Sequence, residues 1–275
     1  MSTPGAAAAR PAAIAGRAPL RRRLAGVPGL PAVAVALLAL VLWSALARWG
    51  GWADYVLPSP AQVLAGLGED LASGRLVTDV VASLYRVMLG YGLACALGVP
   101  CGLVLGHAPL ARAALLPGVN FFRALSPLAW IPFAILWFGI GDVPVVFLIF
   151  MATFFPLVLA VMGAVANVPP IWLRVGREYG LRGPRLLAHV TLPAILPQLI
   201  TALRVTVGLA WLVVVAAEMV AGRDGLGFAI WDARNGLRAD LLVARMAAIG
   251  TIGVVLDALL GRLTRLPGVR WGHGG

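Results

Sequence analysis

Ionisable side chains interrupt several long apolar runs of this sequence, and chemistry is expected first at these positions. A charged group inside an apolar span is costly, so it marks either a functional site or a structural ion pair. Five ionisable residues and one tryptophan between two prolines are our candidates for a pathway through the protein. These candidates are Arg123, Trp130, Arg204, Glu218, Arg245 and Asp257.

Arg204 and Glu218 lie in the same apolar run, fourteen residues apart. They fall on nearly the same face of a helix, but a rise of 1.5 Å per residue separates them by about 21 Å, so they do not pair with each other. Arg123 and Arg245 are the possible partners from neighbouring helices. A structural ion pair stays open for each ionisable residue, and packing or interfacial anchoring stays open for Trp130.

The residue types present exclude several kinds of catalytic site. All 22 basic residues are arginine, so neither a P-loop lysine nor a Schiff-base lysine exists. The three histidines are far apart in the sequence and form no metal-ligand pattern. No Gly-x-Ser-x-Gly motif accompanies the few acids. We therefore expect no catalytic residue, no metal and no cofactor on this chain, and any ATP to be bound by another subunit.

The composition indicates several membrane spans. Of the 275 residues, 61% are hydrophobic and only 12% are charged, whereas a soluble domain has about 25% charged residues. The formal net charge is +11. In so apolar a chain, an excess of arginine is typical of cytoplasmic loops and does not indicate binding to nucleic acid.

Six apolar runs are long enough to cross a bilayer. The predicted fold class is therefore an all-α polytopic membrane protein with six transmembrane helices. Most arginines lie in the two termini and in the 166–193 loop, which we place on the cytoplasmic side. Small residues of the second run allow close helix packing: Gly90, Gly92, Gly98 and Gly102. The predicted spans are residues 31–47, 80–106, 115–140, 143–166, 194–221 and 241–260.

The flanking segments differ in composition from these spans. Residues 1–30 are rich in Ala, Pro, Gly and Arg and are expected to form a disordered basic cytoplasmic tail. Residues 31–262 are expected to form the transmembrane domain, with its core at 80–262, and residues 263–275 a second cytoplasmic tail. An amphipathic external helix is expected after Ser59, with Glu69 and Asp70 on its polar side.

The 166–193 loop is the most informative segment. It is polar enough to leave the membrane, yet apolar residues recur at helical spacing on both sides of a break from Gly180 to Pro184. The pattern predicts two short helices separated by this break. A short amphipathic helix that projects from a membrane bundle fits a groove on a partner protein, and a helix lying on anionic lipid is the alternative.

The second half of this loop carries a specific spacing. Gly180 is followed ten residues later by Val190 and then by Leu192-Pro193. This resembles the "EAA" loop of ABC importer permeases, in which Glu-Ala-Ala precedes a glycine, an aliphatic residue and Leu-Pro at these distances. The glutamate is absent here, because the three positions that name the motif are Arg174, Val175 and Gly176.

The resemblance extends over roughly residues 57–262. The subfamily that it indicates is the permease of binding-protein-dependent importers for aliphatic sulfonates, nitrate and taurine. Where that subfamily often has Ile-Pro before Pro-Leu-Ala-Trp, this chain has Leu125-Ser126. The segments that carry the resemblance are Leu57-Pro58-Ser59-Pro60, Pro127-Leu128-Ala129-Trp130-Ile131-Pro132, and residues 83–87, 135–141, 210–219, 225–227 and 232–235.

The resemblance implies a type I ABC importer permease fold in the inner membrane. Two copies of the chain would surround a translocation pathway, with two cytoplasmic ATP-binding subunits below and a periplasmic or lipid-anchored solute-binding protein above. The chain would be a transport subunit and not an enzyme, driven through alternating access by ATP hydrolysis on its partner. The residues that would couple the two are Arg174, Val175, Gly176, Arg177, Glu178, Gly180, Val190, Leu192 and Pro193.

The solute that the resemblance favours is an aliphatic sulfonate, nitrate or taurine. A permease for a vitamin precursor is the alternative within the same family. A secondary transporter is the alternative outside it, although that class usually has more spans and internal repeats.

Overall fold

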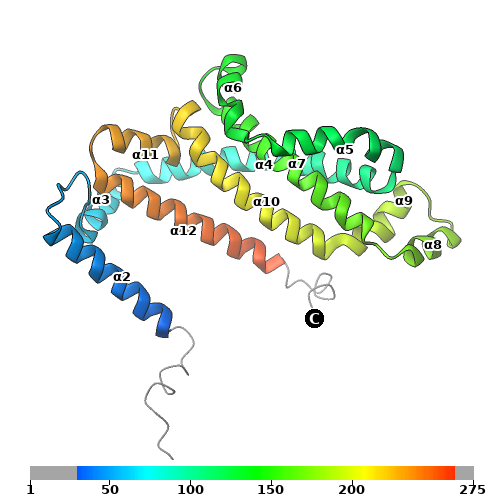
Figure 1. The fold of residues 1–275 in the computed structure, drawn as a ribbon, viewed down its shortest axis with the longest axis horizontal. Coiled ribbons are helices and arrows are strands. Elements are labelled where there is room, and N and C mark those ends of the chain that lie inside the picture. Colours follow the sequence, from blue (N-terminus) through cyan, green and yellow to red (C-terminus); the bar gives the residue numbers. More distant parts are fainter. Residues whose placement is uncertain (1–29, 264–275) are drawn as a thin grey trace, which may run out of the picture. The chain divides into compact units, whose positions relative to one another are not determined.

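The computed structural model describes residues 30–263, and every regular element within them is a helix (Figure 1). Most of the two predicted cytoplasmic tails, 1–30 and 263–275, lies outside the described residues. The elements are α2 (Leu30–Trp49), α3 (Pro60–Ala72), α4 (Arg75–His107), α5 (Pro109–Ala124), η1 (Pro127–Trp130), α6 (Ile131–Phe138), α7 (Asp142–Ala166), α8 (Pro170–Glu178), α9 (Pro184–Leu186), η2 (Leu187–Thr191), α10 (Leu192–Ala221), α11 (Leu226–Asn235) and α12 (Ala239–Leu263).

Five helical stretches are long and apolar enough to cross a membrane: α2, α4, α7, the continuous stretch Pro184–Ala221, and α12. The remaining predicted span, 115–140, is broken. Its two halves, Pro109–Ala124 and Pro127–Phe138, meet at an angle of 87°. Leu125 and Ser126 are extended, as the residue before a proline tends to be. Counting the bent pair as one span gives the six that the sequence predicts.

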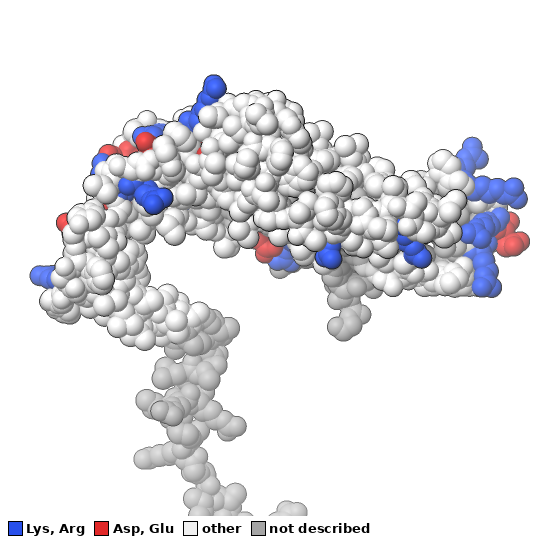
Figure 2. Space-filling view, turned by 45° about the horizontal axis from the view of Figure 1, so that its top comes forward, with Lys and Arg blue, Asp and Glu red and all other residues white. Residues whose placement is uncertain are grey.

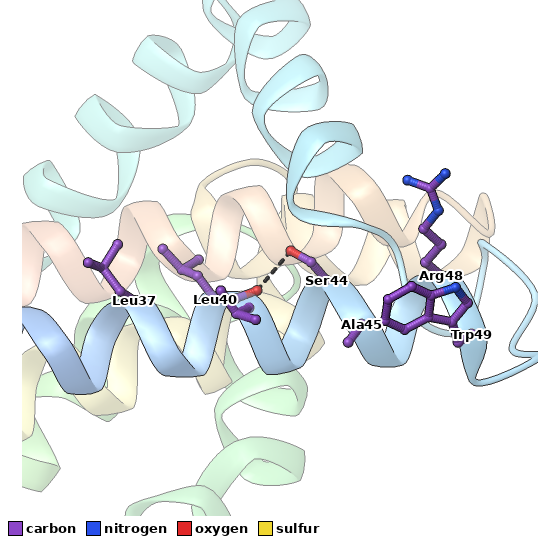
Figure 3. Close-up of a pocket in the computed structure, with 7 residues that line it drawn as sticks. Leu37, Leu40, Ser44, Ala45, Arg48 and Trp49 are labelled. Carbon is purple, nitrogen blue, oxygen red and sulfur yellow. Dashed lines mark hydrogen bonds between the residues drawn. The ribbon is translucent and has the colours of Figure 1, made fainter.

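The chain separates into two compact units after Trp52. The described helix of the first unit is α2, in which none of residues 32–49 is buried. A shallow groove of about 370 Å³ runs along it, and the Ser44 hydroxyl donates to the Leu40 carbonyl over 2.8 Å (Figure 3). A helix that is apolar on all sides is stable only in lipid or against another protein.

In the second unit, α4 packs closely along α7. A Cβ added to Gly90 would lie 2.7 Å from the Val146 carbonyl oxygen, and one added to Gly102 would lie 2.8 Å from that of Val158. In lipid, this close approach gives the van der Waals contact that holds helices together. The predicted packing role is confirmed for these two glycines. It is wrong for Gly92 within residues 30–263, where an added Cβ has no neighbour within 4 Å.

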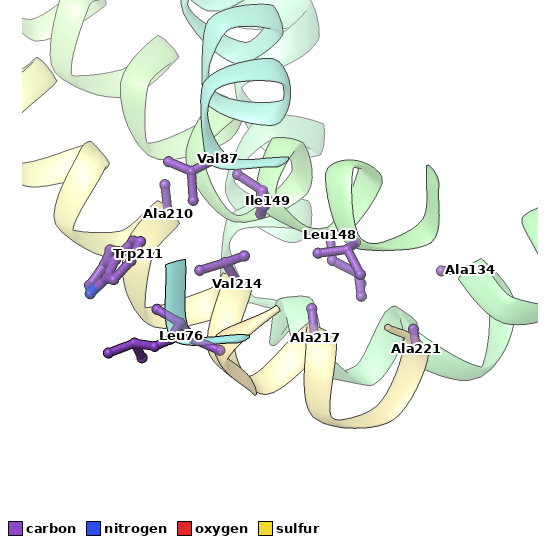
Figure 4. Packing of buried hydrophobic residues seen from close by; sticks show 12 residues of the cluster. Leu76, Val87, Ala134, Leu148, Ile149, Ala210, Trp211, Val214, Ala217 and Ala221 are labelled. Atoms are coloured by element: carbon purple, nitrogen blue, oxygen red, sulfur yellow. The ribbon is translucent and has the colours of Figure 1, made fainter. Parts of the chain in front are cut away.

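The helix α10 completes this core against α4 and α7 (Figure 4). Ala210, Val214 and Ala217 are fully buried there. Trp211 is also buried, and its indole N–H donates to the Ile249 carbonyl of α12 over 3.1 Å. The core therefore joins helices that come from distant parts of the sequence, from α4 to α12.

The predicted amphipathic helix is α3. Ser59 is its N-cap, and the Ser59 side chain accepts from the Gln62 N–H. The Ser59 N–H in turn donates to Gln62 Oε1 over 2.7 Å, and the two bonds form a capping box. The expectation that both acids lie on the polar side is wrong for Asp70. Only 4% of Asp70 is exposed, because Arg245 lies beside it in the interior.

Candidate functional site

The 166–193 loop lies at one end of the second unit and joins α7 to α10 (Figure 1). Its first predicted helix is confirmed as α8, which starts with Pro170 in its first turn. The second is wrong as a separate helix, because α9 continues through the π-helical turn η2 into α10. A proline inside a helix crowds the carbonyl four residues earlier, and the wider π-turn before Pro193 accommodates it.

Gly176 fixes α8 against the rest of the loop. It is buried, and an added Cβ would lie 2.8 Å from Leu186 Cδ1 and 3.0 Å from Val190 Cγ2. A side chain at this position would push α8 away from η2. The loop resemblance singles out Gly176 and Val190, and the structure brings these two residues into contact.

Gly180 ends α8 in a left-handed conformation, with φ of 79°. The Leu181 N–H donates to the Gly176 carbonyl over 3.0 Å, and the Gly180 N–H donates to the Arg177 carbonyl over 2.9 Å. This pair of bonds is a Schellman motif, in which glycine is favoured because it has no Cβ. The glycine of the sequence motif is therefore explained by the end of the helix.

The outer surface of α8 combines apolar and basic side chains. Ile171, Val175 and Tyr179 are exposed and lie four residues apart, which places them on one face. Basic side chains gather at this end of the molecule (Figure 2). Four exposed arginines of the loop form no ion pair with a described residue: Arg174, Arg177, Arg182 and Arg185.

Glu218 lies at the opposite end, which we name the α11 end, and is part of a closed network. It is fully buried, and Arg86 of α4 donates to it over 2.8 Å. The Ser83 hydroxyl and the Gly227 N–H each donate to its second oxygen over 2.9 Å. Arg86 also pairs with Asp142 and Asp224, so that α4, α7, α10 and the turn before α11 are tied together.

Arg245 forms a second buried network at the α11 end. It is 1% exposed and donates to both carboxylate oxygens of Asp70, over 2.7 and 2.9 Å. A third bond, of 2.5 Å, goes to the Ala229 carbonyl.

Nearby on the surface, Arg238 pairs with Asp240 and Glu69, whose hydrogen bonds raise the pKa of this guanidinium above its ordinary value. Both carboxylates therefore balance a permanent positive charge.

The expected partners of Arg204 and Glu218 were wrong. Arg204 of α10 makes two bonds, of 2.6 and 2.5 Å, to Asp257 of α12, and both side chains are about half exposed. Glu218 pairs with Arg86 and not with Arg123 or Arg245. The reason is that α4, and not α5, packs beside α10 at the level of Glu218.

The two remaining candidates lie at the bent span. Arg123 is exposed in the last turn of α5 and forms no ion pair within residues 30–263. Trp130 is half-buried and lies 6.4 Å from Phe147 between ring centroids, with Trp137 at 6.3 Å. Trp130 is thus part of an aromatic cluster along the bend.

Arg86 and Asp70 were not predicted as ion-pair partners, although the sequence carries one signal for Arg86. Asp79, Ser83 and Arg86 follow one another at intervals of four and three residues, which places them on one face of α4. That face is buried. One oxygen of Asp79 accepts from the Gly225 N–H over 3.1 Å, and the other is buried without a partner among the described residues.

The family model for the binding-protein-dependent transport system inner membrane component matches residues 98–267. A probable ABC transporter permease of Brucella melitensis is 36% identical over 229 residues, which are 81% of this chain and 93% of the relative. The taurine transport system permease protein of Escherichia coli is 33% identical over 231 residues, which are 82% and 84% of the two chains. The chain belongs to this family of transport-system membrane components, and its type is that of an ABC importer permease.

The fold has a counterpart among solved structures. An inward-facing structure of the MetNI methionine ABC transporter matches with a TM-score of 0.62 at 20% sequence identity. The match covers 69% of this chain and 94% of that one. At this identity the likeness supports the fold alone, and it agrees with the predicted type I permease architecture.

Proposed function

We propose that two copies of this chain form a membrane pathway and that each 166–193 loop docks a separate ATP-binding subunit. The observation that carries the docking proposal is the exposed apolar stripe of Ile171, Val175 and Tyr179 on α8. A short helix with such a stripe fits a hydrophobic groove on another protein. The exposed, unpaired arginines elsewhere on the loop add positive charge that a partner surface can complement.

The anchoring of α8 explains how docking would move the spans. Gly176 packs against Val190 in η2, and η2 continues into α10 without a break. A displacement of α8 is therefore passed to α10. The loop also touches α4, because the His107 ring lies 3.1 Å from the Thr191 hydroxyl. Closure of two ATP-binding subunits would switch the helices between two rigid states, which gives alternating access.

The assembly that follows has its ATP chemistry on other chains. Two ATP-binding subunits lie on the cytoplasmic side with the loop and both termini, and ATP is bound there and not on this chain. A periplasmic or lipid-anchored solute-binding protein delivers solute at the α11 end. The arginines of the loop support this orientation, because positively charged loops stay in the cytoplasm.

The proposed solute is an aliphatic sulfonate, nitrate or taurine, with a vitamin precursor as the alternative. The taurine permease named above and the segments that resemble this subfamily support the choice. Among the pathway candidates, Arg123 is favoured, because it is exposed at the bend and pairs with no carboxylate of the described residues. Glu218 and Arg245 are proposed to be structural, since each is buried with its hydrogen bonds satisfied.

Docking is tested by placing charge on the stripe. The Val175→Asp and Tyr179→Asp double variant is expected to lose co-purification with the ATP-binding subunit and to lose solute uptake. The control is Leu64→Asp, at a leucine of α3 near the α11 end whose exposure lies between those of Val175 and Tyr179. Unchanged co-purification of the double variant would show that α8 lies on lipid, which is the alternative interpretation.

The orientation is tested by chemical labelling. Cys95 and Cys101 are first replaced by serine, and a single cysteine is then introduced at Tyr179, which is 83% exposed. A membrane-impermeant maleimide should label Tyr179→Cys in inverted vesicles and not in intact cells. Labelling in intact cells would place the loop outside and overturn the proposed docking.

A further inference from the structure

A cavity of about 580 Å³ lies between the 166–193 loop and the end of α4. Its volume falls in the range of small-molecule sites. The loop contributes most of its wall, and the last residue of α4, His107, contributes the rest. Its lining residues are His107, Arg177, Leu181, Arg182, Gly183, Leu186 and Leu187.

The lining is apolar on one part and cationic on another. Three leucines form the apolar part, and Arg177 and Arg182 bring two guanidinium groups. The lining includes no carboxylate, and neither arginine forms an ion pair within the described chain. Both nitrogens of His107 are occupied, one 3.0 Å from the Leu103 carbonyl and the other 3.1 Å from Thr191. The free charge of the cavity is therefore that of the two arginines.

A second cavity, at the α11 end, shows that an arginine that lines a cavity can also be paired with carboxylates. That cavity, of about 340 Å³, contains Arg238 together with Asp54 and Asp240. Its guanidinium is neutralised by Asp240 at 2.8 Å and by Glu69 at 2.7 Å. The cavity beneath the loop differs because its positive charge has no counterpart in the described residues.

Position on α8 separates this cavity from the docking stripe. At 3.6 residues per turn, Arg177 lies roughly 160° around the helix from the middle of Ile171, Val175 and Tyr179. A subunit seated on the stripe therefore approaches a different side of α8. The cavity instead borders the final turn of α4, where a membrane-spanning helix reaches the level of the lipid headgroups.

We propose that this cavity binds the phosphate group of an anionic phospholipid, with an acyl chain along the leucines. The two guanidinium groups suit a phosphate, since arginine binds phosphate oxygens through paired N–H donors. Basic pockets between spans on the cytoplasmic side of membranes bind such headgroups. The inference rests on the proposed orientation of the loop. A lipid held there touches both the loop and α4, so that it affects their coupling.

The test measures retention of phosphatidylglycerol by native mass spectrometry on the purified chain of each variant, and for the unsubstituted chain also on its complex with the ATP-binding subunit. The pocket variant is Arg177→Gln with Arg182→Gln. The matched control is Arg174→Gln with Arg185→Gln, which removes the same charge from the same loop outside the cavity. We expect the apparent dissociation constant to rise about tenfold or more in the pocket variant and to change less than about twofold in the control.

Three results would overturn the proposal. Equal weakening in both variants would show that only the general surface charge attracts lipid. Displacement by millimolar inorganic phosphate would assign the cavity to a free anion. Retention by the isolated chain but not by the complex would show that the subunit fills the cavity. Lipid retention is measured on the isolated chain, so it can be tested even if α8 does not dock the ATP-binding subunit. A failure of the docking proposal is therefore distinguishable from a failure of the lipid proposal.

Discussion

The arginines at the two ends of the second unit differ in burial and in partners. At the α11 end, Arg86 and Arg245 are almost fully buried. Arg86 is held by three carboxylates and Arg245 by one, and each also donates to a backbone carbonyl. At the loop end, Arg174 and Arg177 are exposed without an ion pair in the described chain. A buried charge is tolerated only with its partners, whereas an exposed unpaired charge is available to another molecule.

This difference assigns separate tasks to the same residue type. Arg86 and Arg245 join helices that are distant in sequence, so their removal should damage the fold. The loop arginines contact nothing that the fold needs, so their removal should damage binding. The following substitutions test this separation, in order of decreasing effect on stability.

The largest loss of stability is expected for Arg86→Leu, because it leaves Glu218 buried without its cation. Breaking a buried pair in this way typically costs about 3–5 kcal/mol. The measurement is the fraction of folded protein after heating in mild detergent, followed by size-exclusion chromatography. Arg223→Leu is the control, because Arg223 is an exposed arginine at the same end. Equal losses in both variants would contradict the structural role of Arg86.

Two adjacent acids of α3 give a sharper comparison. Asp70→Asn weakens a buried pair with Arg245 and should cost on the order of 2–3 kcal/mol. Glu69→Gln weakens an exposed pair with Arg238 and should cost less than about 1 kcal/mol. Denaturant unfolding of the two variants side by side measures the difference. If Glu69→Gln were the more damaging change, the burial of Asp70 would be wrong.

A smaller effect is expected at the end of α8. Gly180→Ala places a Cβ on a residue with φ of 79°, which costs about 1 kcal/mol. The global unfolding midpoint should shift little, because α8 lies outside the core, while protease cleavage within the loop should become faster. Gly92→Ala, in open space on α4, is the control, and cleavage should stay unchanged there.

The smallest effect on stability is expected for the loop arginines themselves. Arg174→Gln should leave the unfolding midpoint unchanged, because surface substitutions usually alter stability by less than about 0.5 kcal/mol. The same variant should bind the ATP-binding subunit more weakly. Its association rate should also depend less on the salt concentration, because one steering charge has been removed. Surface plasmon resonance at two salt concentrations checks this, and an unfolded Arg174→Gln variant would remove the distinction between the two ends.

Several features of the fold could be predicted from the sequence because their signals are local. Hydropathy predicted the spans, and the spacing of apolar residues predicted α8. Ser59 indicated the start of α3, and in the structure it forms a capping box with Gln62, three residues further on. The apolar stripe of α8 was likewise visible, because Ile171, Val175 and Tyr179 repeat every four residues.

The continuity of the loop with α10 could not be predicted in the same way. Gly183 and Pro184 are typical of a break, and the structure has this break between α8 and α9. Leu192-Pro193 is typical of a new helix start. The structure instead carries the helix through a π-turn, and packing of Val190 on Gly176 holds that turn in place. Local residue preferences do not contain this contact between α8 and η2.

The sequence by itself determined that the chain is an arginine-rich bundle of membrane helices with a projecting amphipathic helix. The composition and period of each segment are enough for that, since they depend only on neighbouring residues. Only the tertiary structure decided which charges are partners. Arg86 and Glu218 are 132 residues apart, and Asp70 and Arg245 are 175 apart. Pairs so distant depend on which helix faces pack together, and this packing is set by the shape of many side chains at once.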